Sequence, residues 1–100
     1  MGNVGELIIR HEKNKTSGRY VVDLGDGMVG EMTYQRQNPS TIVIDHTRVP
    51  QEFRGQNIAG KLMDYAIAQA RRNKDKIVPV CSYVEAKFRR NKDWADVLAK

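Results

Sequence analysis

The chain has little of what several classes of protein require. It has one cysteine, Cys81, among 100 residues, which excludes an internal disulfide framework and leads us to expect a reducing, cytoplasmic location. No apolar run approaches the roughly 18 residues that cross a bilayer, and the first residues lack the basic and apolar pattern of a secretory signal. We also expect no metal site and no membrane partner.

Aromatic residues are scarce, at 7%, and acidic residues are fewer than basic ones, which gives a net charge of +5. This balance favours an anionic partner, either nucleic acid or a phosphorylated cofactor. The basic residues gather in two clusters, Arg71, Arg72, Lys74 and Lys76, and Lys87, Arg89, Arg90 and Lys92. The first cluster follows an expected helix C-terminus, where cations are favourable, and aromatics are not interleaved as a base-stacking platform requires. The pattern therefore favours a solvated charged face over a nucleic-acid site.

Apolar segments separated by turn signals predict an antiparallel meander in the first half of the chain. The expected strands are 7–11, 19–24, 28–34 and 41–46, with turns at 13–18, 25–27 and 38–40. Gly30 marks a bulge or a close approach inside the third strand. The nearly continuous apolar run of the fourth strand predicts burial on both faces.

The second half of the chain predicts a helix, a strand and a further helix. Apolar residues recur at three- and four-residue spacing between Gly55 and Asn73, which predicts an amphipathic helix. Residues 77–81 then form a fifth strand, in which Pro79 must lie at an edge or a point of strand separation. Ser82 is expected to cap a second helix. A last turn or short helix is expected to contain Trp94, Val97 and Leu98.

A right-handed crossover makes the last two strands parallel. The expected fold is therefore α+β: a mixed, mainly antiparallel five-stranded sheet with a β-α-β-α second half, in one domain spanning residues 1–100.

The most informative segment, residues 49–60, leads from the fourth strand through a small-residue loop into the long helix. Such a junction presents free backbone N–H groups and the positive end of a helix dipole. It suits a phosphate or pyrophosphate group. The alternative interpretation is an ordinary helix start without a ligand.

Within this segment, Arg54-Gly55-Gln56-Asn57-Ile58-Ala59 resembles the acyl-CoA pyrophosphate loop of the Gcn5-related N-acetyltransferases, Gln/Arg-x-x-Gly-x-Gly/Ala. Residues 44–47 and 78–84 are similar to the small YjdJ-type branch of that superfamily, which lacks long N-terminal helices. Asn57 replaces the central glycine of the loop. Asparagine tolerates left-handed backbone conformations better than most residues, although its side chain occupies space near the cofactor.

The resemblance implies an acetyl-CoA site with no metal. The fourth and fifth strands would splay to admit the pantetheine arm, and the N–H of Val49 would polarise the thioester carbonyl. The residues implied in cofactor binding are Thr47, Arg48 and Val49 beside the pantetheine, and Arg54, Gly55, Gln56, Asn57, Ile58, Ala59 and Gly60 around the pyrophosphate.

His46 and Cys81 are the candidate catalytic residues. An imidazole can take a proton from an amine near neutral pH, although His46 can equally be a structural histidine. His11 is expected to be structural or exposed. Cys81 can accept the acyl group, protonate the departing thiolate, or serve as a small buried hydrophobe. By the resemblance, the tyrosine acid of larger relatives is replaced by Phe88, with Tyr83 a helical turn earlier.

The leading hypothesis is an acetyl-CoA-dependent N-acetyltransferase that acts on a primary amine, either a small molecule or a protein lysine. One alternative is a CoA- or acyl-CoA-binding module with little catalysis. The other is a small basic nucleic-acid-binding protein, which the charge alone supports. The basic surface argues against strongly cationic acceptors.

Overall fold

A computed structural model describes residues 8–99 of the chain. In chain order the elements are β1 (Ile9–Lys13), β2 (Ser17–Gly25), β3 (Met28–Asn38), β4 (Thr41–Arg48), the 3-10 helix η1 (Gln51–Phe53), α1 (Ile58–Asn73), β5 (Lys76–Pro79), α2 (Ser82–Arg90) and the 3-10 helix η2 (Lys92–Val97). This order confirms the expected sequence of elements. Leu7, the start of the first expected strand, lies outside the described residues.

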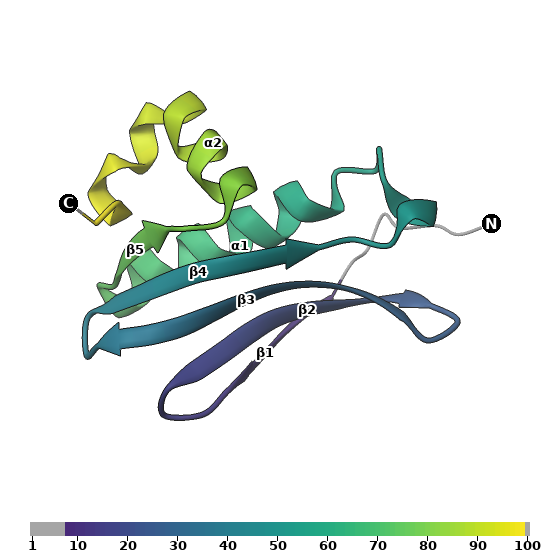
Figure 1. The fold of residues 1–100 in the computed structure, drawn as a ribbon, viewed down its shortest axis with the longest axis horizontal. Helices are drawn as coiled ribbons and strands as arrows, with labels where there is room; N and C mark the ends of the chain where they lie inside the picture. Colours follow the sequence, from purple (N-terminus) through teal and green to yellow (C-terminus); the bar gives the residue numbers. More distant parts are fainter. Residues whose placement is uncertain (1–7, 100) are drawn as a thin grey trace.

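The strands form one five-stranded sheet in the order β1-β2-β3-β4-β5 (Figure 1). Neighbouring strands are antiparallel from β1 to β4, and β4 and β5 are parallel. The mixed, mainly antiparallel sheet and the α+β class predicted from the sequence are confirmed. Pro79 lies on the edge strand β5, as a residue without an N–H donor should.

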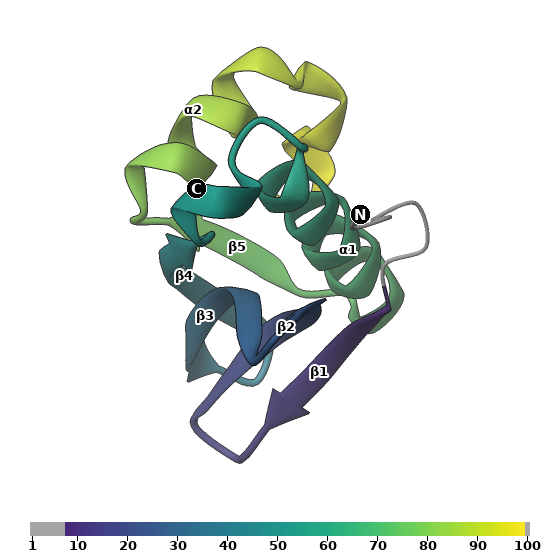
Figure 2. The same cartoon turned by 90° about the vertical axis from the view of Figure 1, so that its right-hand side faces the viewer.

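The helices lie on one side of the sheet. In the turned view, α1 covers one face while α2 stands beyond β5, and no helix of residues 8–99 covers the opposite face of β1 to β3 (Figure 2). The core between α1 and the sheet includes Met32, Ile44, Leu62 and Met63, all fully buried. No helix in this part of the chain is both long and apolar enough to cross a membrane.

Gly30 brings β3 close to the start of α1. A Cβ atom at this position would lie 3.0 Å from Ile58 Cγ2 and 3.1 Å from Val22 Cγ1. The missing side chain therefore lets the first turn of α1 rest directly on the sheet, and the expectation of a close approach at Gly30 is confirmed.

The expectation that β4 is buried on both faces is wrong. Ile42 and Ile44, on the α1 side, are buried, whereas Val43 on the other face is only half-buried and Asp45 and His46 are exposed. The physical reason is that only the α1 side of the sheet is covered, so a run of β-branched residues here reflects strand propensity more than two-sided burial.

Three boundaries also differ from expectation. The helix α1 begins at Ile58, not at Gly55, and β5 ends at Pro79. The N-cap of α2 is Cys81, not Ser82, and no side chain hydrogen-bonds to the end of the helix there. Because Pro79 cannot continue the ladder, the chain leaves the sheet early and α2 starts at once.

His11 is a structural residue in an aromatic cluster. Its Nε2 atom lies 2.7 Å from the hydroxyl of Tyr34, and its ring lies 4.6 Å from that of Tyr20. Tyr65 of α1 contacts the Tyr20 ring edge-on at 5.5 Å. Burial lowers the pKa of His11 and raises the pKa of Tyr20 and Tyr34. The cluster joins β1, β2 and β3 to α1.

An ion pair holds the paired end of β4 and β5. The guanidinium of Arg36 donates to both carboxylate oxygens of Asp75, at 3.1 and 3.0 Å, and to the carbonyls of Asn38 and Pro39. The Asp75 side chain is 6% exposed. The pair thus joins the β3–β4 turn to the segment between α1 and β5.

We predict that Asp75→Ala lowers the free energy of unfolding by about 2 kcal/mol, since it removes two charge-assisted hydrogen bonds of the half-buried Arg36 guanidinium, which keeps only the carbonyls of Asn38 and Pro39. Asp93→Ala, which removes an exposed carboxylate, serves as the control and should change stability by less than about 0.5 kcal/mol. Urea denaturation followed by circular dichroism measures both. Equal, small effects of the two substitutions would contradict the role given to the Arg36–Asp75 pair.

Candidate functional site

The strands β4 and β5 part in the middle of β4. Their pairing ends at Ile44 opposite Pro79, and the amides of Val80 and Cys81 both donate to the carbonyl of Ile44, at 3.2 and 3.1 Å. Beyond this point, among residues 8–99, no main-chain hydrogen bond joins β4 to the chain that follows β5. The expected splay of these strands is confirmed.

A β-bulge sits at the same point. The β3–β4 register passes from Thr33 opposite His46 to Tyr34 opposite Ile44, which leaves Asp45 as the extra residue. The hydroxyl of Thr33 donates to Asp45 Oδ1 at 2.6 Å, so the Asp45 side chain lies on the sheet face opposite α1. His46 is cross-strand from Thr33 and lies on that face too. The bulge therefore places two consecutive side chains on one face.

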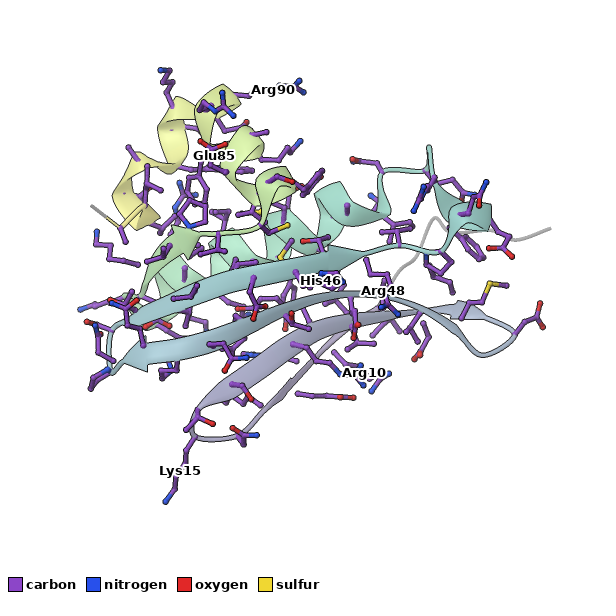
Figure 3. The ribbon with its side chains drawn as sticks, in the orientation of Figure 1. Arg10, Lys15, His46, Arg48, Glu85 and Arg90 are labelled. Atoms are coloured by element: carbon purple, nitrogen blue, oxygen red, sulfur yellow. The ribbon has the colours of Figure 1, made fainter. Side chains whose placement is uncertain are left out.

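Thr47 lies on the other face of β4, toward the helices. It pairs across the sheet with the fully buried Met32, and the thiol of Cys81 donates to Thr47 Oγ1 at 3.6 Å. The two predicted catalytic residues are thus both placed at the splay but on different sides of β4. Figure 3 shows His46 on the strand, near Arg48.

The predicted pyrophosphate loop runs through η1 into α1 with two left-handed residues. Gly55 has a φ of 88°, and Asn57, the N-cap of α1, has φ 60° and ψ 31°. Asn57 therefore adopts the conformation for which glycine is usually chosen. Its side chain folds over Gly60, where an added Cβ would lie only 2.1 Å from Asn57 Oδ1.

The backbone amides of this loop are free. Within residues 8–99, no acceptor is hydrogen-bonded to any main-chain N–H from Gly55 to Gly60, whereas the next amide, of Lys61, donates to the carbonyl of Asn57 at 3.1 Å. A run of unsatisfied amides at the start of a 16-residue helix is a favourable anion site.

Two adjoining clefts connect this loop to the splay. Each has a volume of about 420 Å³. The residues common to both are Val49, Arg54, Ala59 and Tyr83; the first cleft adds Phe53, Gly55, Asn57, Ile58 and Gly60, and the second adds His46, Thr47 and Arg48. Of the residues predicted to bind the cofactor, Gln56 alone lines neither cleft and is exposed on the loop. Cys81 touches the site through Thr47.

Tyr83 is the residue that sequence reasoning undervalued. It lies in the first turn of α2 and lines both clefts. Burial, followed by the charges of Asp64 and Cys81, raises its pKa above the ordinary tyrosine value. Phe88, the position compared with the family's tyrosine, is instead part of the core and packs edge-on against Trp94. The signal was the position of Tyr83 two residues after Cys81, at the helix start that faces the splay.

The described part of the chain offers no obvious metal centre: within residues 8–99, no three or more His, Cys, Asp or Glu residues gather at a distance that would hold an ion.

A mixed sheet whose two parallel strands part, with the start of a long helix beside the opening, is an arrangement of the Gcn5-related N-acetyltransferase fold. Residues 19–97 match the family model described as GCN5-related N-acetyl-transferase. The chain belongs to this family, as its resemblance predicted.

A solved structure of similar fold supports the assignment. The chain is 27% identical to a GCN5-like candidate N-acetyltransferase from Staphylococcus aureus, known from its NMR solution structure, with a TM-score of 0.66. The match covers 90% of this chain and 87% of that one. Among curated proteins, none matches the sequence significantly.

Proposed function

We propose that the protein is an acetyl-CoA-dependent N-acetyltransferase that transfers the acetyl group to a primary amine. The observation that carries the proposal is the run of free amides from Gly55 to Gly60, which lines a cleft continuous with the splay of β4 and β5. Family membership makes acetyl-CoA the expected anionic ligand.

The residues present fit this ligand. The free amides and the side chain of Arg54 would hold the pyrophosphate, since both supply donors to phosphate oxygens. The open edge of β4 would pair with the pantetheine amides through the main chain of Thr47, Arg48 and Val49, as an added strand does. The acetyl group would then lie beside Thr47 and Tyr83.

The two sides of β4 supply different groups to the proposed reaction. His46, on the face opposite α1, accepts a proton from the acceptor as the amine nitrogen attacks the carbonyl carbon. The N–H of Val49 stabilises the oxyanion that forms. As the carbon–sulfur bond breaks, a donor on the helical side protonates the thiolate. Tyr83 suits this role best, because its raised pKa keeps it protonated.

Cys81 has a supporting place in this scheme. Its thiol donates to Thr47 and is half-buried at the N-cap of α2. From there it can protonate the thiolate in place of Tyr83 or accept the acetyl group transiently. The predicted cytoplasmic location stays a prediction.

The alternative of a CoA-binding module with little catalysis is favoured by one observation, the separation of His46 and Cys81 on different sides of β4. The nucleic-acid alternative loses support because some of the clustered basic side chains pair with carboxylates on the surface, which lowers the positive charge available to a ligand. Arg71 pairs with Asp96 at 3.0 Å, and Arg89 pairs with Glu85 at 2.6 Å.

Titration with acetyl-CoA, followed by NMR of the backbone amides, tests the cofactor site. We expect the amide signals of residues 55–60 to shift, because these N–H groups gain an acceptor, while signals of the β1–β2 turn around Lys15 stay in place. Arg54→Gln should weaken binding about tenfold. The control Arg72→Gln, at the far end of α1, should leave it unchanged. No shift of residues 55–60 at millimolar acetyl-CoA would rule out the site.

The role of Tyr83 is tested by its phenylalanine variant. With an amine acceptor, Tyr83→Phe should lower kcat about 10- to 100-fold, the contribution of a general acid to a modest leaving group. Tyr83 donates only while protonated, and its pKa is raised, so the alkaline decline of kcat in the wild type should lie above about pH 10 and be lost in the variant.

The control for this prediction is Tyr65→Phe, which removes a hydroxyl from the aromatic cluster away from the clefts and should keep full activity. An unchanged kcat in Tyr83→Phe would assign the proton to Cys81 or to water. Absence of turnover by the wild type with every amine tried would favour the binding module.

A further inference from the structure

The sheet face opposite α1 carries a network of ion pairs. Arg10 pairs with Asp23 at 3.2 Å and with Glu12, and Arg19 pairs with Glu12 at 2.9 Å and with Glu31 at 2.7 Å. This ion-pair network spans β1, β2 and β3. Val21 is cross-strand from Arg10 and from Glu31 and is 0% exposed, although no helix of residues 8–99 covers this face.

Arg48 lies next to this ion-pair network but takes part in none of its ion pairs. It is cross-strand from Glu31, whose carboxylate is bonded to Arg19. Among residues 8–99, no ion pair or side-chain hydrogen bond involves Arg48. Its guanidinium is exposed and lines the second cleft together with His46. The neighbouring carboxylate is thus occupied, and the charge of Arg48 is available to a ligand.

On this face of β4 the side chains follow in the order Asp45, His46 and Arg48, which are acidic, imidazole and basic. The bulge turns Asp45 to the same face as His46, and Thr33 donates to one oxygen of Asp45, while no other residue of 8–99 hydrogen-bonds to the second oxygen. Arg48 lies on this face two residues after His46, a spacing of about 6.6 Å along a strand. Figure 3 shows His46 and Arg48 next to each other along β4. A negative and a positive group therefore flank the proposed base.

We propose that the acceptor is a small amino acid or a similar molecule with an amine and a carboxylate a few bonds apart. Its carboxylate binds Arg48, while its amine lies between Asp45 and His46 and points into the splay. This inference rests on the proposed acetyl transfer and adds the class of acceptor. The reaction joins the amine nitrogen to the acetyl carbon, releases CoA as the thiol and moves the amine proton to His46.

Other amines fit the site less well. A polyamine or a lysine in a basic peptide would bring a second cation against Arg48. The cleft volume of about 420 Å³ is within the range of small-molecule sites. Arg54 also lines this cleft, but it belongs to the loop that holds the pyrophosphate.

The test compares amino acids with their amides on the CoA-saturated protein. Glycine, β-alanine and 4-aminobutyrate, each with its carboxamide, are titrated while the amide signals of residues 45–48 are followed, so that binding is measured without turnover. The best of the three acids should bind at least about tenfold more tightly than its amide, the value expected for a charge-assisted hydrogen bond. Arg48→Gln should abolish this difference, and Arg10→Gln, the matched arginine outside the cleft, should keep it.

Three results would overturn the proposal: equal binding of acids and amides by the wild type, an acid preference that survives in Arg48→Gln, or an Arg48→Gln defect confined to acetyl-CoA affinity. Failure of the proposed function gives a different pattern, namely no acetyl-CoA binding by the wild type. Acetylation of the preferred acid, measured as thiol release, would then place binding and reaction at the same site.

Discussion

The carbonyl of Ile44 accepts hydrogen bonds from the amides of both Val80 and Cys81, and beyond it the strands β4 and β5 separate. Two residues enforce this separation. Pro79 brings no N–H to the ladder, and Asp45 is the extra residue of a bulge that bends β4. Every feature of the site depends on this opening, because a continuous ladder would close the edge of β4 and leave the helix start at Asn57 without a channel beside it.

The opening is stable because β4 and β5 are held together at their other end. Arg36 and Asp75 join the turns there, and the amide of Lys76 donates to the carbonyl of Ser40 at 2.8 Å. The two strands therefore form a wedge, closed at Thr41 and open at Asp45. The bulge also sorts the side chains: Asp45, His46 and Arg48 face the uncovered side of the sheet, and Thr47 faces Cys81 and the helices. An acyl donor and an amine can thus meet from opposite sides of one strand.

The strand order, the parallel pair and the loop that leads into the long helix could all be predicted from the sequence, because each depends on local patterns: turn residues, apolar spacing, and Gly55 and Asn57 before a helix. The sheet face on which each β4 side chain lies could not be predicted. A bulge shifts the alternation of side chains between the two faces by one residue, and no residue pattern in the segment Thr41 to Arg48 indicates a bulge. The value of Tyr83 was missed for a related reason, since its place in the clefts depends on where β5 ends and α2 begins, and boundaries follow from tertiary contacts.

The central claim is that the acetyl group lies in the wedge between β4 and the start of α2. Intermolecular NOEs from the methyl protons of ¹³C-acetyl-CoA, recorded without an acceptor, test it most directly. The account predicts NOEs to the γ-methyl of Thr47 and to the ring protons of Tyr83. NOEs confined to another surface, such as the groove lined by Phe88, Ala95 and Leu98 between α2 and η2, would contradict it.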